Sequence, residues 1–355
     1  MNAIIKNAPL APLTTLRIGG AAKELWTIGS EDECVAAITQ LDADGEPFFV
    51  LGGGSNVVIA DDGFDGTALH LVYEGAEHQQ RGDKSFAIDA SAGDDWPLLV
   101  DALVEAGLSG VECLAGIPGS VGATPIQNVG AYGQEVATTI EAVRVYNRAS
   151  KKVEEMTAGQ CGFGYRSSAL KGNSNLVVLG VRFLLELSPL SAPVAYRELA
   201  AKLDLEIGAT AEAAAVRAAV LELRSAKGMV LDERDHDTWS AGSFFTNPIL
   251  SADDFAQLEL RVAEHCGAGQ SAPRFEAGDG MFKSSAAWLI EQAGFSRGTT
   301  RGQVALSSKH TLALTNLGDA SAAELIAFAR EIADRVDQLF AVKLRPEPAL
   351  VGLKW

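Results

Sequence analysis

One glycine-rich segment of this chain has the residue types and spacing to bind a ligand through its backbone. Residues 116–133 read GIPGSVGATPIQNVGAYG, with five glycines and no charged side chain. Flexible linkers are rich in polar residues, whereas this segment interleaves glycine with Ile, Val and Ala, so we expect it to be ordered and partly buried. Consecutive backbone N–H groups on such a path form a concavity that suits a pyrophosphate. The alternative is a tight buried connection between two elements, and the segment alone leaves both open.

A second glycine cluster interrupts an apolar run. Residues 48–60 read FFVLGGGSNVVIA, so Gly52, Gly53, Gly54, Ser55 and Asn56 separate two strand-like runs. A plain hairpin is one interpretation, but a two-residue turn would suffice for it. Three glycines followed by Ser-Asn favour backbone wrapped around an anion. No lysine follows and no GxGxxG opens a helix, so neither a P-loop nor a Rossmann turn is predicted.

Two further segments place single polar side chains among aromatic residues. Arg166, within GFGYRSS, stands between an aromatic ring and two hydroxyls and could hold a carboxylate bidentately. A surface arginine in a turn is the alternative. Ser243, within AGSFFTNP, precedes two phenylalanines, where a hydroxyl must find a partner. It is either a buried structural serine or a reacting group, and the lack of a GxSxG elbow argues against a hydrolase nucleophile.

The C-terminal half contains three further candidate functional residues, a glutamate and two lysines. Glu347 lies between Pro346 and Pro348, which fix the direction of its backbone. Lys227 closes an alanine-rich helical stretch, and Lys283 lies further along. An exposed tail carboxylate and lysines that merely complement a helix dipole are the alternatives.

The elements that must position these residues can be read from local patterns. Ser30 with Glu33 forms a capping box for a helix to about Leu41, and Asp94 is expected to cap a helix that ends at Gly107. Ser321 with Glu324 opens a long amphipathic helix. Strands are expected at residues 68–73, 86–90, 142–146, 176–187, 304–307 and 311–314, helices at 211–227 and 286–293, and a polar loop at 230–240. The pattern predicts an α+β protein with a boundary near Val230.

Composition narrows the class of protein. The chain has 355 residues, 47% of them hydrophobic and 21% charged, and a net charge of −17. That acidity argues against a nucleic acid partner. The four cysteines are isolated, which fits free thiols in a reducing compartment, and the five histidines lack metal-ligand spacing. With no signal peptide and no apolar run of about 18 residues, we expect no membrane association and a cytoplasmic protein.

These segments together resemble one family, the UDP-N-acetylenolpyruvoylglucosamine reductases (MurB). The resemblance covers nearly the whole chain and includes the segments TLRIG, LGGGSN, GIPGSVG, QNVGAYG, FGYR, AGSFF, WLIEQ and PE, at residues 15–19, 51–56, 116–122, 127–133, 163–166, 241–245, 288–292 and 346–347. The sequence VAYREL around Tyr196 is similar to the tyrosine loop of the type I branch. Two departures are Ala123-Thr124 and the polar segment at residues 232–238, which is longer than in some members.

The resemblance implies a fold and a division of the chain. The fold would be α+β, of the FAD-binding type of vanillyl-alcohol oxidase, with two lobes followed by an α+β substrate domain. The first lobe would be residues 1–70, the second 71–229 and the substrate domain 230–341. Residues 342–355 would be a tail that returns to the active site and the flavin lobe. We expect the protein to act as a monomer.

The resemblance also implies roles for the singled-out residues. FAD would be bound non-covalently, and NADPH would visit the substrate cleft, reduce FAD and leave before UDP-N-acetylglucosamine enolpyruvate enters. Hydride would then pass from flavin N5 to C3 of the enolpyruvyl group, with Ser243 giving a proton to C2 and Arg166 and Glu347 stabilising the enolate. The residues implied for FAD are Gly52, Gly53, Gly54, Ser55, Asn56, Gly116, Gly119, Ser120, Gly122, Gln127, Asn128 and Gly133. Those implied for the substrate are Tyr196, Lys227, Asn247 and Gln292, with Lys283 a further candidate.

Two other functions compete with this reading. One is a flavin-dependent sugar or alcohol oxidase of the same fold, which would leave Tyr196, Lys227 and Ser243 without roles. The other is a flavin- or nucleotide-binding module without turnover, against which the joint presence of Arg166, Ser243 and Glu347 argues.

Overall fold

The computed structural model of the protein describes residues 3–267 and 269–355. The described residues form two compact units that are interleaved along the chain. The first takes the described parts of residues 1–8, 22–54 and 65–230, and the second those of residues 9–21, 55–64 and 231–355. The glycine cluster after Leu51 is divided between them, because the boundary falls after Gly54. The four-part division predicted from the sequence stays a prediction.

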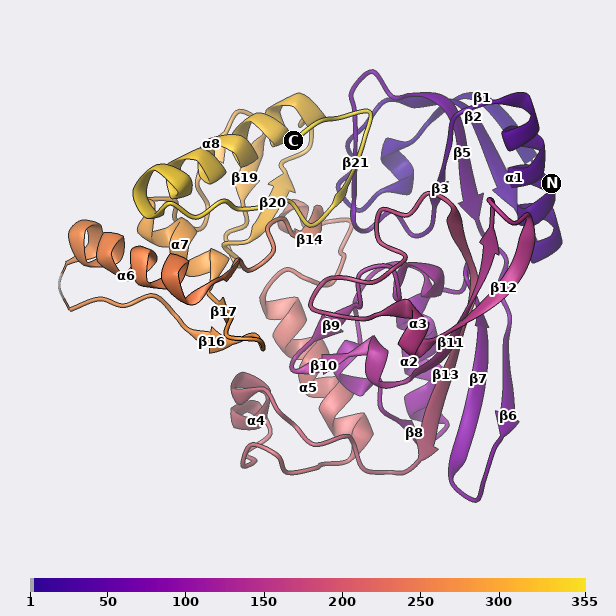
Figure 1. The fold of residues 1–355 in the computed structure, drawn as a ribbon, viewed down its shortest axis with the longest axis horizontal. Helices are drawn as coiled ribbons and strands as arrows, with labels where there is room; N and C mark the ends of the chain where they lie inside the picture. The colour runs from indigo at the N-terminus through magenta and orange to yellow at the C-terminus, as the bar shows by residue number, and fades with distance from the viewer. Residues whose placement is uncertain (1–2, 268) are drawn as a thin grey trace. The chain divides into compact units, whose positions relative to one another are not determined.

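The first unit is built on two sheets (Figure 1). One has four strands in the order β1-β2-β5-β3, and the other has six, with neighbours β12-β11-β13-β7-β6 and β8 paired with the end of β13. A two-stranded ladder of β9 and β10 completes them. The strands are β1 (Ala3–Pro9), β2 (Ala21–Ile28), β3 (Phe48–Leu51), β5 (Phe64–Leu71), β6 (Ala76–Gln80), β7 (Ser85–Ser91), β8 (Leu108–Ser109), β9 (Gly130–Ala131), β10 (Gln134–Glu135), β11 (Ile140–Asn147), β12 (Lys152–Thr157) and β13 (Leu176–Leu187).

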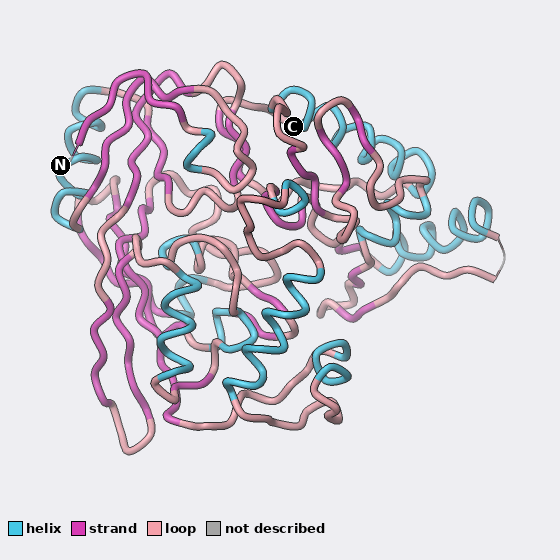
Figure 2. Tube along the Cα trace, turned by 180° about the vertical axis from the view of Figure 1, so that it is seen from behind, coloured by secondary structure: helices cyan, strands magenta, loops and turns pink. Residues whose placement is uncertain are grey.

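Helices supply the other side of the first unit's core. Buried residues of α1 contact the smaller sheet, while α2 and α5 pack next to each other (Figure 2). The helices are α1 (Glu31–Asp44), α2 (Trp96–Glu105), α3 (Ala158–Cys161), α4 (Arg197–Lys202) and α5 (Ala213–Ala226), with 3-10 turns η2 (Glu112–Leu114), η3 (Val121–Ala123) and η4 (Val136–Thr138). One hydrophobic cluster runs through these elements, so the unit has a core of its own.

The second unit is a smaller α+β assembly around the sheet β14-β20-β19-β18. Figure 1 shows α8 running beside β19 and β20, and the cluster of buried residues includes side chains from α6, α7 and α8. Its elements are η1 (Ala11–Leu13), β4 (Val57–Ile59), η5 (His236–Thr238), β14 (Ser240–Ser243), β15 (Ile249–Leu250), α6 (Ala252–Cys266), β16 (Phe275–Glu276), β17 (Phe282–Lys283), α7 (Ala286–Gln292), β18 (Thr300–Arg301), β19 (Val304–Leu306), β20 (Ala313–Asn316), α8 (Ala322–Phe340) and β21 (Ala349–Val351).

The predicted α+β class is confirmed, and most predicted elements are present. The long strand at residues 176–187 and the capping box at Ser321 are as expected. Ser30 caps its helix as predicted, but the Glu33 carboxylate accepts a hydrogen bond from Gly29 N, and the helix runs on to Asp44.

Two local predictions are wrong, and one alternative is excluded. The cap of α2 is Asp95, whose side chain accepts from Leu98 N, while Asp94 accepts from the backbone N–H groups of Gly75 and Ser91. The runs on either side of Gly52–Gly54 form no hairpin, because β3 pairs in parallel with β5 and β4 pairs in parallel with β21. The strand expected at residues 311–314 begins at Ala313, since a turn occupies residues 307–312.

The described residues contain no helix long and apolar enough to cross a membrane. No group of three or more His, Cys, Asp or Glu side chains within residues 3–267 and 269–355 is arranged to hold a metal ion. All four cysteines are free thiols, and burial raises the pKa values of Cys34 and Cys113 to about 12, which leaves both thiols unreactive at neutral pH.

One carboxylate fixes the inserted residues 55–64 to the C-terminal helix of the same unit. Asp61 accepts hydrogen bonds from Ala322 N through Oδ1 at 2.6 Å and from Ala323 N through Oδ2 at 2.9 Å. These N–H groups lie in the first turn of α8, where no intrahelical partner exists and negative charge is favoured.

We expect Asp61→Ala to lower the free energy of unfolding of the second unit by about 1–2 kcal/mol, because two N–H groups of α8 lose a charged acceptor. Asp62→Ala, a change at the exposed neighbour, is the matched control and should stay within about 0.5 kcal/mol of the parent protein. Urea unfolding of both variants measures the difference. Equal effects from the two substitutions would show that Asp61 does not hold α8.

Candidate active site

The two glycine-rich segments of the sequence meet within the first unit. A Cβ atom on Gly53 would lie 2.7 Å from Gly119 Cα, and one on Gly52 would collide with Ser120 Oγ. Contacts this close leave no room for a side chain on either glycine. The packing of one loop on the other therefore accounts for part of the glycine content, as the alternative of a tight buried connection allowed.

The segment at residues 116–133 is ordered, as expected, and its backbone is paired with neighbouring elements. Gly119 O accepts from Trp96 N at 3.0 Å, and Gly122 N donates to Ala92 O at 2.9 Å. A Cβ on Gly122 would lie 2.6 Å from Ala92 Cβ, so this glycine is required by packing. The polar residues Gln127 and Asn128 that follow are buried.

The side chain of Asn128 makes hydrogen bonds that link the glycine-rich segment to its neighbours. Its Nδ2 donates to Glu135 Oε2 at 2.7 Å and to Gly164 O at 3.1 Å, and its Oδ1 accepts from Ala137 N at 3.1 Å. These bonds tie the segment to the turn that carries Arg166. The side chain of Asn128 therefore shapes the loop, and its predicted part in holding a cofactor stays a prediction.

Arg166 is anchored on the same segment. It has a left-handed backbone (φ 50°) in the turn between Gly164 and Ser167, and its Nη2 donates to Gly130 O at 3.0 Å. The guanidinium also lies over the Tyr165 ring, 5.6 Å from its centroid. The half-buried cation is thus held by backbone carbonyls of the glycine segment, which fixes its position before any ligand binds.

Two of the predicted substrate residues gather beside the end of this segment. The rings of Tyr132 and Tyr196 meet edge to face with centroids 5.4 Å apart, and Lys227 Nζ lies 5.5 Å from the centroid of Tyr132. Lys227 is also ion-paired with Glu198, which belongs to the first turn of α4. A Cβ on Gly133 would lie 3.1 Å from Ala195 Cβ, so the loop before Tyr196 packs on the glycine segment.

Arg224 is a charged residue of this region that the sequence reading missed. It lies one turn before Lys227 on α5 and next to Gly116, and its Nη2 donates to Met229 O at 2.8 Å while its Nε is buried without a hydrogen-bond partner. Burial lowers its pKa to about 10, so it remains a cation at neutral pH. A buried cation with an open donor fits an anionic ligand such as a phosphate. The spacing Arg-x-x-Lys was its only signal in the sequence.

In the second unit, the C-terminal tail brings Glu347 to Ser243. Ser243 ends β14, opposite Ala313 of β20. The next residue, Phe244, accepts from Glu347 N at 2.8 Å through its backbone carbonyl, and Phe245 and Pro346 form an isolated bridge. The two predicted catalytic residues of this unit therefore lie on adjoining segments, and both are half-buried.

The remaining predicted substrate residues are spread over the second unit. Asn247 Oδ1 accepts from Ala286 N at 2.9 Å and so holds the start of α7. Gln292 lies at the far end of that helix, about 9 Å further along its axis at 1.5 Å per residue, so the structure does not bring these two together. Lys283 lies on β17 opposite Ile249.

The hydroxyl of Ser243 has a partner that the sequence did not indicate. Ser243 Oγ lies 3.3 Å from Nε2 of His310, at the turn before β20. Sequence reading considered the histidines only as metal ligands and found no spacing for that. A lone histidine carries no local signal of a contact with a serine so far away in the chain.

Comparison with known protein families identifies the cofactor class of the chain. A model described as an FAD binding domain matches residues 23–156. With the α+β fold, the contacting glycine segments and the half-buried cations Arg166 and Arg224 beside them, this match defines a flavoprotein.

The particular family follows from the rest of the chain. A model of the C-terminal domain of UDP-N-acetylenolpyruvoylglucosamine reductase matches residues 233–351. The reductase of that name from Streptomyces coelicolor is 51% identical over 98% of this chain and 90% of its own, and that from Thermobifida fusca is 49% identical over 98% of both. The crystal structure of the Thermus caldophilus enzyme, 26% identical, superposes with a TM-score of 0.63 over 98% of both chains. The chain belongs to the UDP-N-acetylenolpyruvoylglucosamine reductase family, as the sequence motifs predicted.

The buried cation Arg224 can be tested by replacing it with an apolar residue of similar length. We expect Arg224→Met to raise the thermal stability of the flavin-free protein, because an uncompensated buried charge is removed, and to lower the amount of FAD that the protein retains. Arg217→Met on the same helix is the matched control, since Arg217 is paired with Asp101 at 2.6 Å. The control should lower stability slightly and leave flavin content unchanged.

Melting temperature of the flavin-free protein and flavin absorbance of the purified protein give the two readouts. A destabilised Arg224→Met variant with full flavin content would mean that Arg224 is a structural residue only.

Proposed function

We propose that this protein reduces the enolpyruvyl group of UDP-N-acetylglucosamine enolpyruvate to give UDP-N-acetylmuramate, with NADPH as the reductant and non-covalent FAD as the cofactor. The observation that carries the proposal is the hydrogen bond from Glu347 N to the carbonyl of Phe244, the residue after Ser243, in a chain about half identical over almost its full length to reductases of this name. We further propose that it works as a monomer in the cytoplasm.

FAD fits the first unit, where glycine loops and the buried cation Arg224 suit a diphosphate. Its holders are the backbone of Gly52–Gly54 and of the segment at residues 116–133. When bound, FAD accepts a hydride from NADPH and donates it to the substrate double bond.

Arg166 and Glu347 are assigned to the substrate carboxylate. As the double bond is reduced, negative charge develops toward that carboxylate, and a fixed guanidinium stabilises the charge without reorganising. Arg166 meets this requirement because Gly130 O and the Tyr165 ring hold it in place. Glu347 can help an anion only when it carries a proton or acts through a cation.

Ser243 is assigned as the proton donor to C2. A hydroxyl is a weak acid, but an enolate is a strong base, and the neighbouring Phe244 and Phe245 are almost fully buried. Such apolar surroundings keep competing water away from the carbon that is protonated.

Substrate binding is assigned to Tyr196 and Lys227 in the first unit and to Asn247, Gln292 and Lys283 in the second. Lys227 supplies positive charge for the diphosphate in a protein of net charge −17. Because Lys227 is paired with Glu198, a diphosphate must compete with that carboxylate.

The two rival functions have less support. An oxidase would leave Ser243 without a proton to deliver, and the curated relatives at 46–51% identity carry the reductase name. A binding module without turnover would have no use for Arg166, Ser243 and Glu347.

Ser243→Ala should separate the two half-reactions. Reduction of the flavin by NADPH needs no proton from Ser243 and should keep its parent rate. Reoxidation by the enolpyruvyl substrate should slow by roughly 10²–10⁴-fold, the usual scale for a lost general acid. Rapid-mixing absorbance of the flavin measures both. Unchanged reoxidation, or equal slowing of both steps, would remove Ser243 from the proton transfer.

Lys227→Ala should raise the KM for the UDP-sugar by about 10–100-fold while flavin content is kept, because a charge-assisted contact worth about 1.5–3 kcal/mol is lost. Lys202→Ala is the matched control, since Lys202 also joins α4 to α5, through Glu222 at 2.7 Å. Steady-state kinetics with the sugar varied tests the pair. If the two variants raise KM equally, Lys227 acts on the helix packing and does not contact the substrate.

A further inference from the structure

The turn that carries His310 is unusually well fixed. Ser307 is fully buried, and its Oγ accepts from Lys309 N at 3.0 Å and from His310 N at 3.2 Å. The carbonyl of His310 accepts from Ala313 N at 3.1 Å, and Thr311 Oγ1 donates to Glu291 of α7 at 2.6 Å. The backbone on both sides of the imidazole is therefore held in one conformation.

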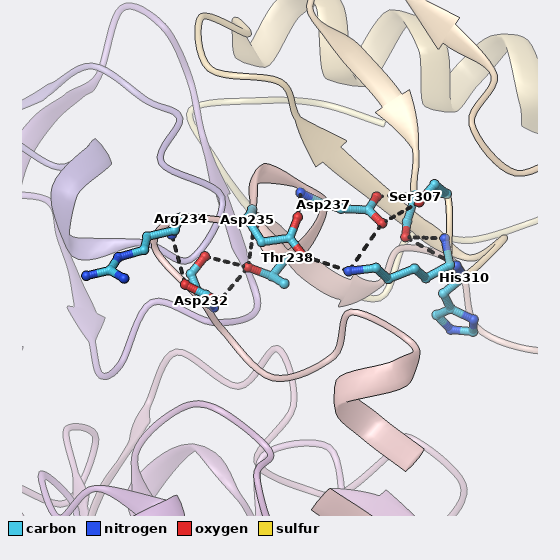
Figure 3. A network of polar contacts seen from close by, with 9 residues as sticks. Asp232, Arg234, Asp235, Asp237, Thr238, Ser307 and His310 are labelled. Carbon is cyan, nitrogen blue, oxygen red and sulfur yellow. Dashed lines mark hydrogen bonds and ion pairs between the residues drawn. The ribbon is translucent and has the colours of Figure 1, made fainter. Parts of the chain in front are cut away.

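A second anchor comes from the polar segment at residues 232–238, whose role the sequence left open. Asp237 accepts from Ser308 N at 2.9 Å and from Ser308 Oγ at 2.8 Å, and Lys309 Nζ pairs with Asp235 at 2.6 Å. Figure 3 shows this chain of contacts running from Asp232 through Asp235, Thr238 and Asp237 to the turn with Ser307 and His310. The segment at residues 232–238 therefore holds the turn in place through these hydrogen bonds and this ion pair.

The segment is itself rigid. Thr238 Oγ1 donates to the carbonyl of Asp235 at 2.7 Å and lies 2.9 Å from that of Asp232, and it accepts from Asp232 N at 3.0 Å. Thr238 is buried. A segment cross-linked in this way holds the backbone of the turn, from which the side chain of His310 extends to Ser243.

The imidazole so held reaches the proposed proton donor, with His310 Nε2 3.3 Å from Ser243 Oγ. Either atom can donate, depending on the tautomer. A serine that gave up its proton unaided would remain as an alkoxide, which is far too basic to persist at neutral pH. Histidine is the side chain best suited to supply a proton near neutral pH.

We propose that His310 relays a proton to Ser243 during reduction of the substrate, an inference that rests on the proposed function. As the Ser243 O–H bond breaks and a C–H bond forms at C2, the Nε2–H bond of the doubly protonated His310 imidazolium breaks and its proton moves to Oγ, which leaves a neutral imidazole. A proton from the solvent, carried by hydronium or buffer acid, then restores the imidazolium and is the one proton consumed per turnover. The step transfers no electrons, and the hydroxyl of Ser243 is regenerated within it. His310 is in this account a positioning and relay residue that does not touch the substrate.

His310→Ala and His310→Gln test the relay in the FAD-loaded enzyme. Glutamine keeps an amide that can bond Ser243 Oγ, but it cannot pass on a proton taken from water. We expect both variants to be reduced by NADPH at the parent rate and reoxidised by the enolpyruvyl sugar about 10–100-fold more slowly. Added imidazole should speed reoxidation of His310→Ala in proportion to its concentration and should not speed that of Ser243→Ala. His265→Ala, a change to an exposed histidine of α6, is the control for both measurements.

Other outcomes overturn the relay. Reoxidation of His310→Gln within threefold of the parent rate would show that His310 only orients the hydroxyl. Slow reoxidation of both variants without rescue by imidazole would make His310 a packing residue. Failure of the proposed function is seen separately, because the parent protein would then show no reoxidation by the enolpyruvyl sugar.

Discussion

The path of the C-terminal tail is the constraint on which the second unit depends. Glu347 N donates to the carbonyl of Phe244, and two residues later β21 begins and pairs in parallel with β4, so the tail is fixed at both ends. This path places a carboxylate and a hydroxyl on adjoining segments although they come from distant parts of the sequence. The same β14 that presents Ser243 is held by β20, whose preceding turn carries His310. Hydroxyl, imidazole and carboxylate segment therefore share one small framework.

The first unit brings positive charge together in an acidic protein. Backbone carbonyls and packing hold the cationic side chains in place. Arg166 is held by a carbonyl of the glycine segment, and Arg224 is enclosed beside Gly116 with a lowered pKa of about 10. Lys227 is kept in place by Glu198 until an anion competes for it. In a chain of net charge −17, these three cations supply the local positive charge that an anionic ligand requires.

Patterns of neighbouring residues were sufficient to predict many of the helices and strands. Contacts between distant parts of the chain, on which much of the candidate site depends, leave no such pattern. The strand at residues 176–187 and the capping box at Ser321 are encoded by neighbouring residues, and both were predicted correctly. The hairpin that the sequence left open at residues 48–60 is excluded, because the partners of both strands lie elsewhere in the chain. His310 and Arg224 were missed for the same reason. The contact of His310 with Ser243 and the position of Arg224 beside Gly116 join distant parts of the chain, which no pattern of adjacent residues records. Arg166, Ser243 and Glu347 were singled out by their local surroundings, the family resemblance supplied their roles, and their shared chemistry stays a prediction.

The central claim is that the flavin of this protein passes electrons from NADPH to an enolpyruvyl sugar. The most direct test is an anaerobic titration of the holoenzyme, followed by visible absorbance of the flavin. The account predicts that one equivalent of NADPH bleaches the flavin and that one equivalent of UDP-N-acetylglucosamine enolpyruvate restores the colour without oxygen. Bleaching by a simple sugar or alcohol, with colour restored only by oxygen, would contradict the account and make the protein an oxidase.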